Sequence, residues 1–246
     1  LDDLTQFHVD RVWVCGVLTA EQGKYLPPVE KCDISDVMSS VHIRDFSEER
    51  LKMHLKSGHV HVIEIQPGGV VTKKSTADVP LDADGDFVWS KDTDIAKVAV
   101  VERHQWTGNV ACALLKGYGI QQGAIALSIA HDSHNVITVG VNDSEMAFAV
   151  KCLEEQGGGI VLVRDGRLVD AMPMPIAGLM SDQPGEWVAE KLESLHENAY
   201  TQLGVHRSVE PVMTLCFMSL AVIPELKLTD MGLFDVTQFS FIPMEA

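Results

Sequence analysis

The segment Lys97-Val-Ala-Val-Val-Glu-Arg103 opens the part of the sequence that predicts the fold most clearly. Its apolar run is typical of a buried strand. From there the patterns predict, in order, a strand over 97–103, a helix over 110–118, strands over 124–130 and 136–141, a helix from 143 and a strand over 160–164. Strand–helix–strand–strand–helix–strand is the order of a ferredoxin-like, split βαβ unit. We therefore expect an α+β fold with helices layered on one face of a sheet.

The helix that starts after residue 142 has the clearest boundaries. Asn142 and Glu145 have the spacing of a capping box. Four apolar residues share one face at helical spacing, namely Met146, Ala149, Val150 and Leu153. Three glycines at 157–159 are expected to end this helix.

The sequence ahead of residue 95 has weaker patterns. Residues 11–18 predict two short strands joined at Cys15-Gly16, and His59–Ile65 alternates as a strand does. Residues 78–94 contain six aspartates with a proline and a glycine, which predicts a solvated loop. We expect residues 1–94 to form a small β-rich segment with a linker, and residues 95–246 to form the main α+β domain.

The composition restricts the possible partners. The 246 residues include 35 acidic and 19 basic side chains, which give a net charge of −16. Because such a surface repels phosphate backbones and anionic lipids, we expect neither nucleic acid nor a membrane among the partners. The five cysteines lie far apart in apolar surroundings, which indicates reduced thiols in a cytoplasmic protein rather than a disulfide framework or zinc site.

Common catalytic motifs are absent from the sequence. Gly117-Tyr-Gly119 lacks the glycine spacing of a dinucleotide site, and His196-Glu197 lacks the second histidine of a zincin helix. His59 and His61 offer two imidazoles on one predicted strand, but nothing nearby supplies a third ligand. We therefore expect no metal site in this chain.

The main candidate site is His131-Asp132-Ser133-His134-Asn135, a polar turn between two predicted buried strands. Turns mounted on rigid strands often carry binding residues. Asp132 can orient either imidazole, and His134 can donate or accept a hydrogen bond near neutral pH. The alternative interpretation is a turn that only satisfies its own hydrogen bonds.

A second polar stretch, Glu102-Arg103-His104, follows the first predicted strand. In a ferredoxin-like order, this stretch and the 131–135 turn need not lie at the same end of the sheet. The sequence therefore leaves open whether His104 lies beside the turn.

The segment Met172–Met180 precedes Ser181-Asp182 and contains two prolines, which exclude a helix or a central strand. The next predicted helix has Pro184 in its first turn. Asp182 fits the N-cap of that helix. The alternative is that Ser181 and Asp182 contribute to a binding site.

Eight stretches of the sequence, taken together, resemble a known family. They are Val100–His104, Thr107–Asn109, Lys116–Gly119, Gly123–Ala126, Ala130–Asn135, Gly157–Ile160, Pro175–Asp182 and Ile223–Asp230. In this order and spacing they are similar to the C-terminal domain of bacterial adenine deaminases, which belong to the amidohydrolase superfamily. The resemblance covers residues 95–243, with a local departure at Gln105-Trp106.

The resemblance implies hydrolysis of adenine to hypoxanthine and ammonia, a reaction of purine salvage. In this family a pair of divalent metals, manganese or iron, activates water on a (β/α)8 barrel. No barrel sequence is present here, and the chain begins at Leu1 without an initiator methionine. We therefore expect the C-terminal part of such an enzyme, with its metals bound outside this chain and with no activity on its own.

The resemblance also implies a role for the polar residues if this domain closes over the barrel. Seven residues are then expected to face the adenine pocket or its entrance, namely His104, His131, Asp132, His134, Asn135, Ser181 and Asp182. Their expected role is to bond the purine ring nitrogens and to exclude water, not to bind metal. The expected partners are adenine, the missing barrel and further copies in a homo-oligomer.

Three other interpretations stay open. In the first, the domain is only a structural or oligomerisation module, with no catalytic contribution. In the second, the enzyme acts on another purine or cyclic amidine. In the third, the chain is a free-standing binding protein that has lost the barrel.

Overall fold

The computed structural model describes residues 3–246, which divide into two compact units; one ends at Asp36 and the other is Val37–Ala246. The first unit holds strands β1 (Arg11–Val14), β2 (Val17–Glu21) and β3 (Lys24–Tyr25), paired in that order. The predicted strand–turn–strand is confirmed by the β1–β2 pairing. None of residues 3–36 is buried, so this sheet has no core of its own.

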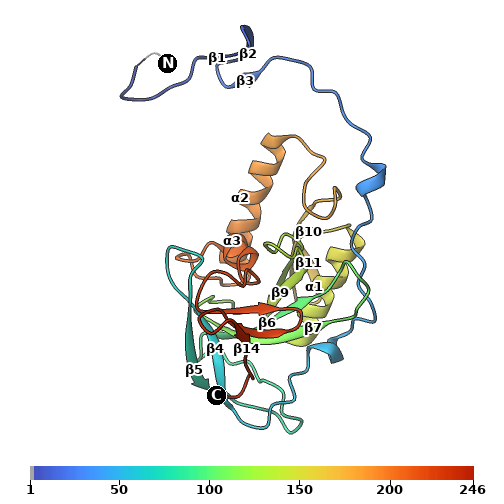
Figure 1. Cartoon of the computed structure of the whole chain (residues 1–246), viewed down its shortest axis with the longest axis vertical. Coiled ribbons are helices and arrows are strands. Elements are labelled where there is room, and N and C mark those ends of the chain that lie inside the picture. The colour runs from blue at the N-terminus through green and yellow to red at the C-terminus, as the bar shows by residue number, and fades with distance from the viewer. Residues whose placement is uncertain (1–2) are drawn as a thin grey trace. The chain divides into compact units, whose positions relative to one another are not determined.

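The second unit is built on one eight-stranded sheet in the order β11-β10-β8-β9-β6-β7-β4-β5 (Figure 1). All neighbouring strands are antiparallel except β4 and β7. In chain order the strands are β4 (His59–Ile65), β5 (Thr72–Asp78), β6 (Ile95–Val101), β7 (Val110–Lys116), β8 (Ala124–Leu127), β9 (Val136–Gly140), β10 (Gly159–Arg164) and β11 (Arg167–Pro173).

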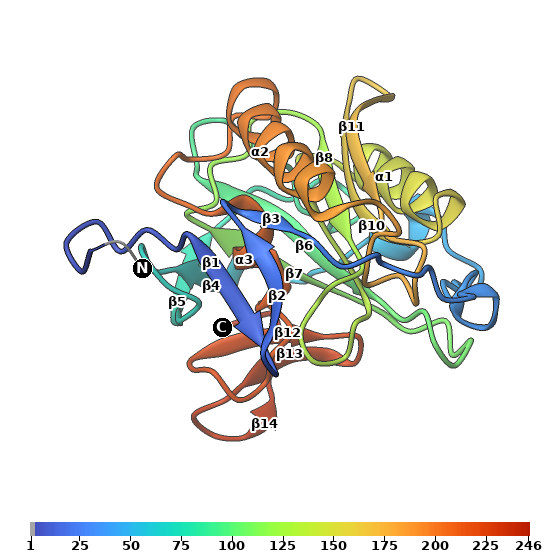
Figure 2. The same cartoon turned by 90° about the horizontal axis from the view of Figure 1, so that it is seen from above.

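Both faces of this sheet are covered by helices. On strand β6 every residue is buried, and successive side chains enter opposite cores. Val98 and Val100 pack in the core that includes α2 (Gly185–Gln202) and α3 (Pro211–Cys216), whereas Ala99 packs in the core that includes α1 (Asp143–Glu155). Figure 2 shows α1 (yellow) and α2 (orange) on either side of the β10–β11 strands. The expected single layer of helices on one face is therefore wrong.

The α+β class is confirmed, but the predicted helix over residues 110–118 is wrong. Residues 110–116 form β7, which pairs with β6 from Val101↔Val110 to Ile95↔Lys116. A short apolar run fits a buried strand as well as a helix, and here pairing with β6 and β4 satisfies its backbone groups on both edges. Because a strand takes the place of that helix, the predicted strand–helix–strand–strand–helix–strand order of a ferredoxin-like unit is not observed.

The predicted start is correct for one of the two long helices and wrong for the other. Helix α1 is confirmed, because the Asn142 side chain accepts a hydrogen bond from the Glu145 N–H at 2.8 Å and the four predicted apolar residues are buried. Helix α2 begins at Gly185 with Pro184 at its N-cap, so the prediction that Asp182 caps it is wrong. No helix within residues 3–246 is long and apolar enough to cross a membrane.

Smaller elements complete the second unit. The 3-10 helix η2 (Glu48–Leu51) precedes β4, and a further 3-10 helix, η1 (Ser35–Val37), spans the boundary between the two units. A third sheet contains β12 (Leu226–Thr229), β13 (Gly232–Asp235) and β14 (Ser240–Phe241).

The region around residue 94 differs from a plain linker. The loop after β5 is not wholly solvated, because Asp86 and Phe87 are buried. Strands β4 and β5, which precede residue 94, share the sheet of β6. The boundary predicted between residues 94 and 95 stays a prediction.

Candidate functional site

The polar turn at residues 131–135 connects β8 to β9, as the sequence predicts. Backbone hydrogen bonds fix it at two points. The His131 N–H donates to the Cys216 carbonyl at 2.7 Å, and the His134 N–H donates to the Ala130 carbonyl at 2.6 Å. The first bond attaches the turn to the end of α3, far away in the sequence, so the turn has one defined position on the core.

The side chains of this turn divide into exposed and buried groups. His131, Asp132 and Ser133 are exposed, His134 is half-buried and Asn135 is buried. The His131 Nδ1 atom contacts the Asp132 carboxylate, which orients the imidazole. The ring centroids of His131 and His134 lie 6.5 Å apart with the rings stacked. The turn thus presents two imidazoles and a carboxylate together.

His104 lies beside this turn, which answers the question that the sequence left open. Its Nε2 atom is 2.8 Å from the Ser133 carbonyl oxygen. The reason is the antiparallel pairing of β6 with β9, in which Val101 faces Val136. The end of β6 therefore lies next to the start of β9, and the loops that extend from these two ends meet.

The loop that carries His104 is held by the buried carboxylate of Glu102. That carboxylate accepts the backbone N–H groups of His104, Gln105 and Thr107 and the Thr107 hydroxyl. Burial alone would raise the pKa of Glu102, but these donors, led by the Gln105 N–H, hold it below its ordinary value. Glu102 is thus an ionised anchor of the loop.

The electrostatic environment keeps one imidazole neutral. Burial, and then the positive charge of Arg103, lower the pKa of His134 below its ordinary value. A neutral imidazole carries one N–H donor and one nitrogen acceptor. His134 can therefore bond either a donor or an acceptor of a heterocyclic ligand at neutral pH.

Two predicted residues are not brought to the turn by any described contact of their own. The Ser181 hydroxyl accepts the Gln183 N–H at 3.1 Å, and Asp182 accepts the Gln183 side-chain amide at 2.9 Å. Their segment is bonded near the turn through two earlier residues: the Ala177 carbonyl accepts a hydrogen bond from Arg103, and the Gly178 carbonyl accepts one from the Ser128 hydroxyl. The structure thus groups His104 with residues 131–135, and no described hydrogen bond joins Ser181 or Asp182 to them.

Sequence reasoning missed two members of this surface. The rings of His42 and Trp106 stack with centroids 6.1 Å apart, and Trp106 is 55% exposed. Trp106 lies two residues after His104, so its position in an otherwise polar loop was the available signal. No sequence signal indicated His42, because this residue is brought to the loop by a long-range hydrogen bond from its N–H to the Arg103 carbonyl.

One buried polar atom in the same region has no hydrogen-bond partner among the described residues. The side-chain oxygen of Asn135 is buried and accepts no hydrogen bond within the described residues. An unpaired buried oxygen is costly and needs an explanation. It makes Asn135 a candidate for bonding a group supplied from outside this chain.

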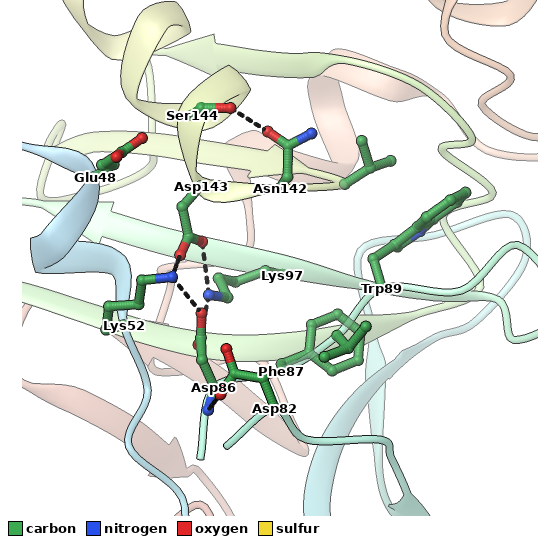
Figure 3. A pocket seen from close by; sticks show the side chains of 12 residues that line it. Glu48, Lys52, Asp82, Asp86, Phe87, Trp89, Lys97, Asn142, Asp143 and Ser144 are labelled. Carbon is green, nitrogen blue, oxygen red and sulfur yellow. Dashed lines mark hydrogen bonds and ion pairs between the residues drawn. The ribbon is translucent and has the colours of Figure 1, made fainter. Parts of the chain in front are cut away.

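A separate cavity of about 560 Å³ lies at the N-terminus of α1 (Figure 3). Lys52 and Lys97 point at the same two carboxylates from opposite sides. The Lys97 Nζ is 2.9 Å from Asp86 and 2.6 Å from Asp143, and the Lys52 Nζ is 3.1 and 3.2 Å from them. Phe87 and Trp89 form an apolar wall. Sequence reasoning missed this buried network, because its members are far apart in the chain.

The charges in this cavity neutralise one another. Burial alone would raise the pKa of Asp86, but the hydrogen bond and charge of Lys97 hold it well below its ordinary value. Within residues 3–246, no group of three or more His, Cys, Asp and Glu side chains is arranged to hold a metal ion. His59 and His61 bond instead to Asp78 and to the Pro243 carbonyl. The mutual pairing makes this cavity a structural element of the fold.

Comparison with known proteins gives a consistent result. The family described as "Adenine deaminase C-terminal domain" matches residues 69–240. The chain is 59% identical over 246 residues to "Adenine deaminase 2" of Desulfotalea psychrophila, covering 100% of this chain and 43% of that protein. It is 44% identical over 244 residues to "Adenine deaminase" of Ligilactobacillus salivarius, covering 99% of this chain and 42% of that protein.

A third relative, "Adenine deaminase 2" of Carboxydothermus hydrogenoformans, is 44% identical over 243 residues, again covering 99% of this chain and 42% of the relative. The chain therefore spans less than half the length of the curated relatives it matches.

Proposed function

Because the chain belongs to the adenine deaminase C-terminal domain family, we propose that it is part of an enzyme that hydrolyses adenine to hypoxanthine and ammonia. The observation that carries this proposal is 59% identity along the whole chain to a protein named adenine deaminase 2. The rest of such an enzyme lies outside these 246 residues, so this chain acts as one domain of it. The proposed setting is purine salvage in the cytoplasm, in keeping with five free cysteines.

The surface of His104 and residues 131–135 is the part of this chain that we assign to substrate. Three features support the assignment. The two loops are joined by the bond between His104 and Ser133, His134 is neutral near pH 7, and Asn135 has a buried oxygen without a partner. Adenine carries ring nitrogens and an exocyclic amine, and neutral imidazole and amide groups can bond both kinds of atom. Ser181 and Asp182 stay predictions.

The family implies a pair of divalent metals, manganese or iron, bound by the barrel. The residues described here do not offer a site for them. The chain's own proposed contribution is to bond the substrate, to orient it and to cover the pocket from water.

A second candidate function is assembly into a homo-oligomer. It is favoured by exposed aromatic side chains on the third sheet, where Phe239 is 73% exposed and Phe241 is also exposed. Both rings pack edge-on against Phe234, with centroids 5.3 and 5.2 Å from it. A rigid exposed aromatic cluster is typical of a protein interface.

The assignment to substrate is tested with His131→Ala and His134→Ala in the complete protein that contains this chain. Turnover of adenine should fall about 100-fold, since general acid–base and hydrogen-bonding groups contribute on that order. The melting temperature of His131→Ala should not change, because His131 is exposed. The metal content should not change in either variant, because the metals are proposed to bind outside this chain. Assays with adenosine and guanine under the same conditions identify the substrate.

The matched control is His59→Ala. His59 is also an exposed histidine bonded to an aspartate, at 2.8 Å from Asp78, but it lies on β4. This variant should keep wild-type turnover. Unchanged adenine kinetics in both turn variants would contradict the proposed role of this surface in binding substrate. Assembly into a homo-oligomer would then be the remaining candidate function.

A further inference from the structure

Arg103 has an unusual environment for a cation. It lies two residues after the end of β6 and is only 1% exposed. Its guanidinium donates three hydrogen bonds, all to backbone carbonyls. The Nε atom lies 2.5 Å from the His134 oxygen, Nη1 lies 3.1 Å from the Ser40 oxygen and Nη2 lies 3.1 Å from the Ala177 oxygen. One side chain thus bonds three segments that are distant in sequence.

No carboxylate in residues 3–246 forms an ion pair with this guanidinium. The neighbouring Glu102 carboxylate is occupied by the donors of the 104–107 loop. Burial lowers the pKa of Arg103, yet an arginine side chain stays charged throughout the physiological range. The charge of Arg103 is therefore stabilised by carbonyl dipoles. In return, its three hydrogen bonds fix the positions of the three backbone segments that supply those carbonyls.

The surrounding backbone is adapted to this arrangement. The Arg103 carbonyl accepts the His42 N–H at 3.1 Å, so the Ser40 segment is bonded by both the side chain and the main chain of the same residue. Gly178, with a φ of +70°, follows the acceptor Ala177. A Cβ atom at position 178 would lie 3.0 Å from Arg103 Nη1. The absence of a side chain there lets the loop approach the guanidinium.

We infer that Arg103 is a positioning residue, which holds the 131–135 turn, the loop that contains Ala177 and the segment at Ser40 in one arrangement. The planar fork of the guanidinium matches three acceptors at fixed angles, which a lysine ammonium cannot do. Arg103 does not touch substrate in this arrangement. It acts through the turn by fixing the carbonyl of His134 and hence the direction of that residue's imidazole. The inference rests on the proposed role of the turn in adenine deamination.

The experiment uses Arg103→Lys and Arg103→Met in the complete protein, with hydrogen exchange and steady-state kinetics on adenine. Amide exchange should rise about tenfold or more in all three segments together, because one group holds them. The kcat should fall about tenfold or more while KM changes little, since misplacement of a bonding group affects mainly the reacting geometry. Lysine should not rescue either property.

Lys227→Met is the matched control. Lys227 is a fully buried cation whose Nζ donates to the Val70 carbonyl at 2.8 Å, and burial lowers its pKa to about 8. This variant removes a buried, carbonyl-bonded cation elsewhere in the fold. It should lower the melting temperature and leave both kcat and exchange in the three segments unchanged.

Two results would overturn the inference. The first is unchanged exchange in the 131–135 turn of both Arg103 variants. The second is an equal loss of kcat in Lys227→Met, because any loss of stability would then explain the effect. If exchange rises but kcat is unaffected by both His131→Ala and Arg103→Met, the positioning result stands and the proposed substrate role of the turn fails.

Discussion

The Nε2 atom of His104 lies 2.8 Å from the carbonyl oxygen of Ser133, which joins the loop after β6 to the turn before β9. Their strands are antiparallel neighbours in the middle of the sheet, so the contact follows from sheet order rather than from sequence proximity. The proposed substrate surface therefore depends on two loops that are held by one core.

His104→Ala in the complete protein should lower kcat/KM for adenine about tenfold, equivalent to about 1.4 kcal/mol. The reason is that the turn loses its bond to the neighbouring loop. The exposed position of His104 predicts little change in the free energy of unfolding. His104→Gln should recover part of the loss, because its amide retains a donor of similar reach. A Gln variant as impaired as the Ala variant would contradict the hydrogen-bond explanation.

Lys97→Met should destabilise the fold by about 3–5 kcal/mol, as expected when one partner of a buried ion pair is removed. Lys97 is buried and bonds Asp86, Asp143 and the Leu51 carbonyl. Lys52→Met is the control, because Lys52 contacts the same two carboxylates from a partly exposed position and should cost only about 1 kcal/mol. Urea unfolding measures both values. Equal losses would show that burial does not set the strength of this network.

The stability of the protein should decrease in acid partly through Asp235. Burial alone would raise the pKa of Asp235, but bonds from Thr237 and Lys74 hold it at about 2. The unfolded value is about 3.9. The carboxylate therefore stabilises the fold above pH 4, by about 2–3 kcal/mol, and this contribution is lost as the pH falls towards 2.

Urea unfolding between pH 5 and pH 2 tests this with Asp235→Asn. The variant should show a smaller decrease of unfolding free energy across that range than the wild type. Asp84→Asn, at an exposed aspartate in the loop after β5, should follow the wild-type curve. If the unfolding free energy of Asp235→Asn decreased with pH as steeply as that of the wild type, other carboxylates would be responsible for the acid sensitivity.

Phe239→Ser should shift the complete protein towards smaller species if the aromatic cluster of Phe234, Phe239 and Phe241 is an interface. Its ring is exposed and rigid against Phe234, so an interface would bury it at little entropic cost. Sedimentation at several concentrations measures the change. Val222→Ser is the control, because Val222 is exposed to a similar degree outside this cluster. The same mass in both variants and the wild type would exclude this cluster from assembly.

Local signals were sufficient where a segment specifies its own structure. The cap formed by Asn142 and the apolar face from Met146 to Leu153 predict α1 with its correct start, because both depend on residues one to four positions apart. The strand–turn–strand at residues 11–18 was also predicted correctly. The 131–135 turn was recognised because five polar residues between two apolar runs have few structural explanations.

Local signals failed where a neighbour decides the structure. Residues 110–116 contain good helix formers, and their strand conformation comes from pairing with β6 and β4. The incorrect helix produced the wrong sheet order, and with it the open question about His104. Asp182 carries a typical capping side chain, but α2 starts after it at Gly185. No sequence signal indicated the role of Arg103. Its three acceptors are backbone carbonyls, which every residue type carries, so no side-chain pattern marks them.

The sequence by itself determined the α+β class, the family resemblance and the residue types of the candidate site, because periodicity, caps and ordered motifs are properties of nearby residues. Only the tertiary structure decided that His104 meets Ser133, that Arg103 bonds three distant backbones and that Lys97 is buried between two aspartates. These contacts join residues that are between 11 and 74 positions apart in the chain. Their approach is set by which strands pair and which faces are buried, and no local pattern in the chain encodes that choice.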